Sequence, residues 1–527
     1  MRYFDNLGKG LKYAAQAAFG VEGDDSPPPF DAAGSGRRSS TWNPGADAIA
    51  ALLISSGDTL RRKSPQLVRN NPWASGAIRT FAAHSVGTGI VPNPMHPDAR
   101  IKQQIEHAWL RWTDDADASG QQDFYGLQTL ACKMLAETGE CFIRLRPRLP
   151  EDGIEVPLQL QLLESEQLPL AKNEDLPIVP PSRYGNKVRA GIEFDAIQRR
   201  VAYHFFLVHP YAGVAAMGDQ TVTTRVPAHR VDPAAGALHL FELLRAGQLR
   251  GQPWMTASLA KLYQLDQFDD ATLSKQMNLA FFMLAVRRAS NSFAGVAGEE
   301  ADDEGKADLV MEPNTLQYLG QDEELQEIGG KGPGTEYATF IKTQLHSVAA
   351  ALGMTYEQLS GDLEGVTYSS IRQGVLDFRR KVEQFQHQVL VYQMCRPIWR
   401  SWMDAAVLSG ALDLPGYASD PEPYRAVEWT PPPFPWVDPE AEVNAAIKEV
   451  RAGFNARADR CKEGGTDRAT VDRKQAEDNA SADEAGVVYD SDGRNPASGT
   501  AATPANDKST TAPPPPAKKT APKEAPQ

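Results

Sequence analysis

Apolar side chains recur along residues 371–402 in steps of four and three, which is the strongest periodic signal in this 527-residue chain. The positions are Ile371, Val375, Phe378, Val382, Phe385, Val389, Tyr392, Cys395, Trp399 and Trp402. This spacing predicts a long helix with one face against a core. Pro397 is expected to kink it, because proline lacks the N–H and its ring clashes with the preceding turn. The sequence leaves open whether Phe385, Trp399 and Trp402 pack within one subunit or between subunits.

The region before this stripe predicts two more helices around an acidic insertion. Residues 254–290 contain no Gly or Pro and keep apolar residues at helical steps, which predicts one helix of about 50 Å. Residues 291–334 are rich in Gly and carboxylates, and residues 335–354 show a second helical stripe. A polar loop, 355–369, is expected next, followed by the long kinked helix and further helices over 370–480.

Helices and strands are mixed in residues 46–253. Residues 46–150 look mainly helical, and Asn71-Pro72 marks a helix start with Pro in the first helical position. Alternating apolar and polar residues then predict several strands. These strands are expected at 141–146, 156–163, 191–195 and 202–208. The fold class is therefore α+β.

Charge and missing motifs exclude several functions. Lys and Arg number 54 against 68 Asp and Glu, so the net charge is 54 − 68 = −14, which argues against a protein that grips nucleic acid along a basic face. No CxxC, HExxH, GxSxG or phosphate-binding GxxxxGK[ST] occurs. We therefore predict no catalytic residues, no metal site and no cofactor. No apolar run approaches the ~20 residues that a membrane span needs.

Both ends differ in composition from the middle of the chain. Residues 1–45 are rich in Gly, Pro and Ser and predict a flexible N-terminal arm. Residues 481–527 carry a Pro/Lys-rich tail with no Leu, Ile, Val or aromatic residue after Tyr489, and they are expected to be disordered because they cannot bury a core.

Three aspartates share one face of the first long predicted helix. Asp266, Asp269 and Asp270 are spaced i, i+3 and i+4, where like charges repel modestly. A solvated outer face explains them, and the functional alternative is a face that lines an acidic passage.

Five segments in order resemble the lambda-type portal proteins of tailed bacteriophages. They are residues 41–44 (TWNP), 67–72 (LVRNNP), 239–253 (HLFE, then RAGQLRGQP), 352–372 (LGMTYEQLS, then YSS and Arg372) and 436–439 (WVDP). The resemblance covers about residues 41–480, and neither terminus contributes to it.

The resemblance implies a ring-forming subunit with named parts. They are a wing (46–253), two stem helices (254–290 and 335–354), a clip (291–334), a tunnel loop (355–369) and a kinked helix leading to a helical crown (370–480). It also suggests where residues meet DNA. The candidates are Asp266, Asp269, Asp270 and Lys275 facing the channel, Asp362, Glu364, Thr367 and Tyr368 in the tunnel loop, and Asp302, Asp303 and Glu304 in the clip.

The resemblance further implies a function and partners. Family rings, usually of twelve copies, occupy one capsid vertex, pass double-stranded DNA during packaging and ejection, and bind terminase, head-completion and tail connector proteins, major capsid protein and scaffold. The expected location is the virion, with host cytoplasm during assembly and no membrane partner. Two alternatives remain: a nucleotide-dependent packaging motor, which the missing phosphate loop opposes, and a non-ring scaffolding or adaptor protein.

Overall fold

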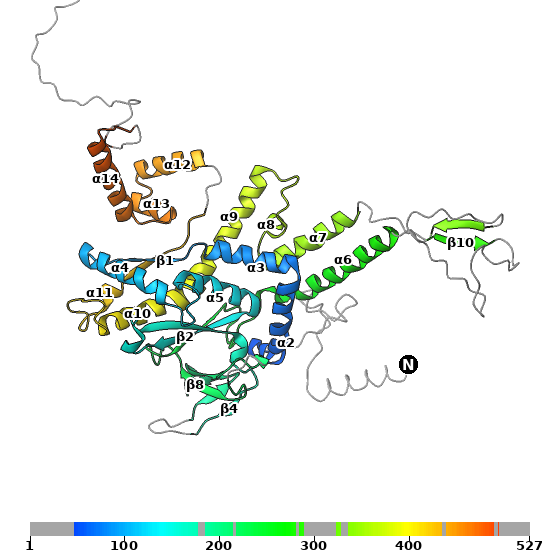
Figure 1. The fold of residues 1–527 in the computed structure, drawn as a ribbon, viewed down its shortest axis with the longest axis horizontal. Coiled ribbons are helices and arrows are strands. Elements are labelled where there is room, and N and C mark those ends of the chain that lie inside the picture. The colour runs from blue at the N-terminus through cyan, green and yellow to red at the C-terminus, as the bar shows by residue number, and fades with distance from the viewer. Residues whose placement is uncertain are drawn as a thin grey trace, which may run out of the picture. The chain divides into compact units, whose positions relative to one another are not determined.

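The computed structural model describes residues 47–177, 185–213, 218–280, 284–288, 323–327, 336–434, 439–489 and 494. The predicted N-terminal arm, the clip carboxylates Asp302, Asp303 and Glu304, and the tail beyond residue 494 lie outside these residues. The chain divides into two compact units, Met1–Pro431 and Pro432–Gln527, and each is described by itself (Figure 1).

The first unit begins with four helices. They are α2 (Ile49–Asn70), α3 (Pro72–Ser85), α4 (Ala99–Asp115) and α5 (Phe124–Thr138). Asn71 separates α2 from α3, and its side chain accepts a hydrogen bond from the N–H of Ala74 at 3.1 Å. Pro72 occupies the first turn of α3, where its missing N–H costs nothing. The predicted helix start at this dipeptide is confirmed.

Two antiparallel sheets follow the helices. The first has the order β3–β2–β9, and the second the order β4–β5–β6–β7–β8. Their bounds are β2 (Glu140–Pro147), β3 (Leu158–Leu163), β4 (Glu174–Asp175), β5 (Lys187–Arg189), β6 (Ile192–Phe194), β7 (Arg200–Phe206), β8 (Thr223–Pro227) and β9 (Ala237–Phe241). All four predicted strand regions coincide with strands, and the α+β class is confirmed.

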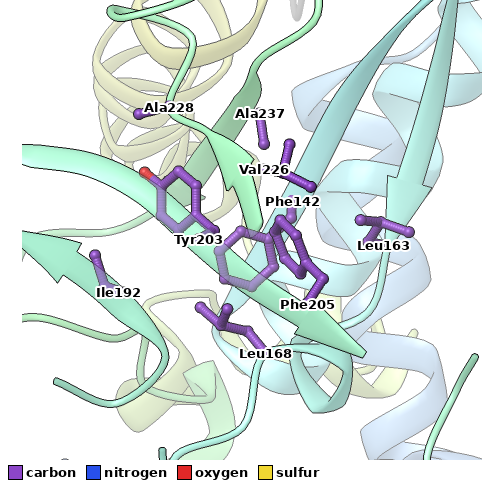
Figure 2. Close-up of a cluster of buried hydrophobic side chains, with 9 residues drawn as sticks. All are labelled: Phe142, Leu163, Leu168, Ile192, Tyr203, Phe205, Val226, Ala228 and Ala237. Carbon is purple, nitrogen blue, oxygen red and sulfur yellow. The ribbon is translucent and has the colours of Figure 1, made fainter. Parts of the chain in front are cut away.

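A hydrophobic core lies where the two sheets meet (Figure 2). Its buried members are Phe142, Leu163, Leu168, Ile192, Tyr203, Phe205, Val226, Ala228 and Ala237. Phe142 from β2 and Phe205 from β7 meet edge to face with ring centroids 5.1 Å apart. Aromatic pairs of this kind add about 0.5–1.5 kcal/mol beyond the area they bury. The core therefore fixes one sheet against the other.

A second core is built from tryptophans. Trp109 and Trp112 of α4 pack with Trp399 and Trp402, and the centroids of Trp109 and Trp402 are 4.9 Å apart. All four side chains are buried inside this one chain. The open question about Trp399 and Trp402 is thus answered, because they pack within the subunit. The neighbouring elements are β1 (Val91–Pro94), α11 (Glu422–Arg425) and β12 (Val427–Thr430), and β1 pairs with β12.

The first predicted stem helix is shorter than expected. A 3₁₀ turn, η5 (Trp254–Ala257), leads into α6 (Leu259–Ala280), and residues 284–288 form strand β10 instead of more helix. β10 pairs antiparallel with β11 (Glu323–Glu327). The prediction of one helix over 254–290 is therefore wrong beyond Ala280. The short apolar run there suits helix or strand, and the pairing places two arginines opposite two glutamates, which favours the strand.

The second predicted stem helix is confirmed as α7 (Glu336–Leu352). It lies beside α6 (Figure 1), and Lys261 Nζ of α6 donates to Ser347 Oγ of α7 at 2.7 Å. Together, α6 and α7 form a helical hairpin, which we call the stem hairpin after the prediction that its two helices form a stem. β10 follows α6 in the sequence, and β11 precedes α7.

The predicted polar loop 355–369 begins with a short helix, α8 (Tyr356–Ser360). Thr355 and Gln358 form a capping box, in which each side chain satisfies a backbone N–H at the other residue. Gly361 ends the helix in a left-handed conformation. The irregular part of the loop is therefore limited to residues 361–367.

The heptad stripe forms three consecutive helical segments. They are α9 (Tyr368–Phe385), the π-helix η6 (Gln386–Cys395) and α10 (Arg396–Leu408). A π-helix bonds i to i+5, so it shifts the phase of the buried face. Leu390 and Val391 are buried as a result, whereas Tyr392 is 53% exposed. The prediction that Tyr392 joins the core stripe is wrong, and the kink at Pro397 stays a prediction.

The described part of the second unit contains three helices. They are α12 (Pro439–Ala452), α13 (Arg457–Glu463) and α14 (Arg468–Ala485). None of them buries a residue. α14 continues four residues past the predicted start of the tail at residue 481, because Gly486 supplies the left-handed C-cap that ends it. In the described part of both units, no helix combines the length and the apolar character that crossing a membrane requires.

Candidate functional site

A buried carboxylate, Glu140, joins four segments of the first unit. Arg61 of α2 donates from Nη2 to Oε1 at 2.8 Å, and Arg250 donates from Nη2 to the same oxygen at 2.6 Å. His239 Nε2 of β9 lies 2.9 Å from Oε2, and the N–H of Gly251 donates to that oxygen at 2.7 Å. All the side chains involved are buried. We call these five residues the Glu140 cluster.

The negative charge of Glu140 is compensated by the arginines that contact it. Burial alone would raise the pKa of Glu140, but the charges of Arg250 and Arg61 and the hydrogen bond from His239 hold it well below its usual value. Burial lowers the pKa of Arg61 to about 10, so both partners remain charged near neutral pH. Buried ions of this kind are tolerated only when their hydrogen-bonding capacity is filled.

Arg250 fills its remaining capacity with backbone carbonyls. It donates to the C=O groups of Ala190 at 2.8 Å, Ser165 at 3.1 Å and Leu168 at 3.0 Å. A planar guanidinium with five donors suits such a junction better than a lysine would. The family-like segment 239–253 therefore has a structural explanation, since it supplies three members of the cluster.

His239 is held as a neutral imidazole by its two contacts. Its Nε2 donates to Glu140, and its Nδ1 accepts a hydrogen bond from Arg200 Nη1 at 2.9 Å. A protonated ring would carry an N–H on Nδ1 that points at the positively charged guanidinium of Arg200, so the neutral form is favoured. Burial lowers the pKa of His239 to about 3, although the hydrogen bond and the charge of Glu140 oppose this shift.

Two glycines let the backbone segments of the cluster approach each other. A Cβ built on Gly251 would lie 2.1 Å from the carbonyl oxygen of Gly139, and one built on Gly139 would lie 2.2 Å from the carbonyl carbon of Gln252. Gly139 also has a φ of 89°, which L side chains rarely adopt. The chain thus brings the end of α5 directly against the segment that enters η5 and α6.

The stem aspartates predicted to face a channel lie in different surroundings. Asp266 accepts a hydrogen bond from Asn71 Nδ2 at 3.3 Å, and Asp269 accepts one from the hydroxyl of Tyr337 at 2.8 Å. Both are half-buried, whereas Asp270 is exposed. Two of the three carboxylates therefore fasten α6 to α3 and to α7.

Lys275 is exposed but does not share the face of the aspartates. It follows Asp266 by nine residues, and at 3.6 residues per turn this places it about half a turn around the helix. Asp266 and Lys275 therefore cannot both point at one axis.

The predicted tunnel-loop residues lie close to the stem hairpin. Asp362 accepts a hydrogen bond from the hydroxyl of Tyr356 at 3.2 Å and lies 3.5 Å from Lys342 Nζ of α7. The N–H of Glu364 donates to Asp362 at 2.9 Å and, with these neighbours, lowers the pKa of Asp362. Glu364 and Thr367 are exposed, and Thr367 Oγ1 lies 3.0 Å from Ser370 Oγ. The side chain of Tyr368 lies outside the described residues.

One group of potential metal ligands occurs in the described part of the chain. Oxygen atoms of Glu164 and Glu166 and a ring nitrogen of His209 lie within 4.8 Å of one another. His209 Nε2 already lies 2.9 Å from a carboxylate oxygen of Glu164. This pair accounts for the close approach.

Sequence reasoning missed the Glu140 cluster. Its members lie up to 190 residues apart in the sequence, from Arg61 to Gly251, so no local spacing reveals them. The available signal was a glutamate directly before the apolar run Cys141-Phe142-Ile143, together with an arginine between Gly247 and Gly251 in the 239–253 segment.

Comparison with known proteins identifies the family. The sequence model described as "Phage portal protein, lambda family" matches residues 35–386, two thirds of the chain. The chain belongs to the lambda family of phage portal proteins. The fold described above is thus that of a capsid portal subunit, and the matched region contains the Glu140 cluster, the stem hairpin and the 361–367 loop.

Curated relatives agree with this assignment. The chain is 25% identical over 493 residues to the "Probable portal protein" of Halomonas phage phiHAP-1, covering 89% of this chain and 92% of the relative. It is 22% identical to the "Portal protein" of Escherichia phage N15 (85% and 88% covered) and 21% identical to "Portal protein B" of Escherichia phage lambda (84% and 89%). A chain from the neck of a native gene transfer agent particle, computed with C12 symmetry, aligns with a TM-score of 0.42 at 13% identity, covering 78% of this chain and 93% of its own.

We predict that Glu140→Gln lowers the free energy of unfolding of the portal subunit by about 3–5 kcal/mol, because it leaves two buried arginines without their counter-ion. The matched control is Glu155→Gln, which removes a carboxylate bound to Arg111 at 2.8 Å on the surface. That change is expected to cost less than about 1 kcal/mol. Urea denaturation measures both values, and equal losses would contradict the role assigned to the cluster.

The neutral state of His239 predicts a loss of stability in mild acid. The unfolded chain binds a proton at this residue near pH 6.5, but the folded chain does so only near pH 3. Stability from this residue is therefore present above pH 6.5 and falls as the pH drops, by about 2 kcal/mol between pH 7 and pH 5. His239→Gln should show a shallower pH dependence of its unfolding free energy over this range. An unchanged slope in the variant would refute the assignment, and Glu140 does not confound it because that group contributes only below about pH 4.5.

Proposed function

We propose that copies of this portal subunit close into a ring at one capsid vertex, with double-stranded DNA passing through the central channel during packaging and ejection. Membership of the lambda portal family carries this proposal. Twelve copies are the usual number in the family, and terminase, head-completion and tail connector proteins, major capsid protein and scaffold are the expected partners. The chain itself would catalyse no reaction, since terminase hydrolyses the ATP. Assembly would take place in the host cytoplasm, and the finished ring would be part of the virion.

The surface of the stem hairpin supports assembly with other copies. α6 exposes four large apolar side chains and α7 one more. They are Tyr263, Leu273 and Met277, on the side of α6 that also carries Asp270, together with Phe268 on the other side, whose ring lies 5.2 Å from that of Phe340. The Phe268–Phe340 side is the one left for contacts between subunits. Apolar side chains gathered on one exposed element mark an interaction surface. In a ring, such contacts are heterologous and repeat until the ring closes.

The same hairpin supplies carboxylates for a channel that DNA can pass without being held. An acidic lining repels the phosphate backbone over a Debye length of about 8–10 Å, whereas many Lys and Arg contacts would bind it tightly. We propose the aspartate side of α6 as the lining, with Asp270 as its exposed member. Asp266 and Asp269 have weaker support, because they already accept hydrogen bonds within the chain. Lys275 would line the channel only if α6 turned its opposite side toward the DNA.

Two other sets of residues remain part of the proposal. Asp362, Glu364, Thr367 and Tyr368 would lie in the tunnel loop near DNA, and the exposed carboxylate of Glu364 is the most available of them. Asp302, Asp303 and Glu304 would lie in the clip and meet terminase or connector proteins.

The ring is tested by negative-stain electron microscopy of the purified full chain. We expect rings with a central hole. A double change away from the aspartate side of the stem hairpin, Phe268→Asp with Phe340→Asp, should prevent ring closure while leaving the subunit folded, as judged by circular dichroism. The matched control is Val231→Asp, an exposed apolar residue outside the stem. Only monomers or irregular aggregates from the unchanged chain would favour the scaffolding or adaptor alternative.

The acidic lining is tested by reversing its charge. Asp270→Lys should make purified rings retain linear duplex DNA in a filter-binding assay, with retention falling steeply as salt rises. The unchanged rings and the control Glu151→Lys, which reverses an exposed carboxylate in the wing, should retain little DNA. If Glu151→Lys and Asp270→Lys increase retention equally, Asp270 does not line the path of DNA.

A further inference from the structure

A deep hollow opens on the first unit between the second sheet and the helix that follows the stem. Its volume is about 910 Å³. Residues of β7, the turn after β8, β9, η6 and α10 line it. This volume lies within the range of about 300–1,000 Å³ that is typical of ligand-binding pockets.

The walls of the hollow are fixed by polar contacts between distant segments. His229 Nε2 lies 2.8 Å from Ser401 Oγ of α10, and that hydroxyl donates to the carbonyl of Pro233 at 2.7 Å. Gln393 of η6 bonds both the N–H and the C=O of Phe241, each at 3.0 Å. The hollow is thus formed before any ligand arrives.

Positive charge is concentrated in this hollow although the chain carries a net charge of −14. Six arginines line it against a single carboxylate, Asp404. They are Arg199, Arg200, Arg230, Arg396, Arg400 and Arg425. A concave surface lined by one sign of charge focuses the field and attracts ligands of the opposite sign.

Three of these arginines have no counter-ion in the described part of the chain. Arg199 pairs with Asp195, Arg425 pairs with Asp404, and Arg200 donates to His239 and to two carbonyls. The side chains of Arg230, Arg396 and Arg400, by contrast, make no hydrogen bond or ion pair to any described residue, and all three residues are exposed.

The positions of these three arginines point to an anionic ligand. Arg396 and Arg400 stand one turn apart on α10, a spacing at which like charges destabilise a helix. Burial and the charge of Arg400 lower the pKa of His229, which agrees with a net positive charge around the hollow. Guanidinium groups bind carboxylates and phosphates through two parallel hydrogen bonds, so they suit either anion.

The apolar part of the lining distinguishes between these anions. Tyr392, displaced from the core stripe by the π-helix, lines the hollow and is 53% exposed, and Val231 is 57% exposed. A DNA duplex is a convex cylinder with phosphates on its outside, so it would leave these side chains uncovered and could not enter the hollow. A peptide with carboxylates and large apolar side chains matches both kinds of lining residue.

We propose that this hollow binds an acidic peptide segment of a protein partner, with carboxylates on Arg230, Arg396 and Arg400 and an apolar side chain on Tyr392. The site is distinct from the stem hairpin and from the 361–367 loop. The proposal does not rest on the ring or on the passage of DNA, and it adds a protein-docking site to the wing side of the portal subunit.

The test is fluorescence anisotropy on the full chain with a labelled twelve-residue peptide of Asp and Glu interspersed with Tyr and Leu. We expect binding that weakens by about tenfold or more in Arg396→Ala/Arg400→Ala, because two charge-assisted contacts are lost. Arg396→Lys/Arg400→Lys should weaken it less, since charge is kept without the planar fork. The control Arg79→Ala removes an exposed arginine of α3 outside the hollow and should leave binding unchanged.

Three further probes decide what the hollow recognises. The same peptide with Asn and Gln in place of Asp and Glu should bind about tenfold more weakly or worse. A twenty-base-pair duplex and inorganic phosphate should compete poorly with the acidic peptide. Unchanged binding of the acidic peptide by the double alanine variant would overturn the proposal. So would arginine-dependent binding of the duplex or of phosphate without binding of the peptide. Thermal unfolding of each variant checks that the fold is intact, which is expected because both side chains are exposed.

Discussion

The position of the α6–α7 hairpin on the two sheets depends on one buried carboxylate. Glu140 receives hydrogen bonds from α2, from β9 and from the segment that runs directly into η5 and α6. A buried ionic cluster is weak evidence for stability as such, because well-packed apolar residues of similar volume can serve as well. Apolar residues would not, however, fix the direction in which the chain leaves the sheet. Arg250 reaches one carboxylate and three carbonyls at once, so it fixes where the chain leaves the sheet and therefore where the hairpin starts.

Glutamine side chains extend this principle to the helical part of the first unit. Gln128 of α5 bonds both the N–H and the C=O of Ile90, and Gln393 of η6 does the same to Phe241 at the end of β9. Each amide substitutes for a neighbouring strand at a backbone position that would otherwise be unsatisfied. The π-helix turns Gln393 toward the sheet and at the same time turns Tyr392 out of the core. A single change of helical period thus docks the helix and opens the hollow beside it.

The sequence predicted those features whose signal is local. The start at Asn71-Pro72, the alternating strands and the helix α7 each depend on neighbours within a few residues, and all were confirmed. The errors came from contacts made across the chain. Residues 284–288 look like the end of a helix until their partner strand, some 40 residues later, is known. The phase of the heptad stripe could not reveal that η6 adds residues to each turn. The Glu140 cluster brings together four segments that are far apart in the sequence, and the spacing of residues in local motifs does not show such contacts.

The net charge of −14 conceals a marked segregation of the basic groups. Arg61 and Arg250 are buried on Glu140, and six further arginines gather around one hollow. On the described part of the stem hairpin, Asp270 and Lys275 are exposed on different sides of α6, and Lys342 lies beside Asp362. If DNA passes along the aspartate side of α6, as proposed above, few free cations there would favour sliding, because phosphate binding strengthens with every free cation along the path. Arginines that are buried or paired can then hold the subunit together, and those in the hollow can bind the proposed peptide, without adding cations to that side of α6.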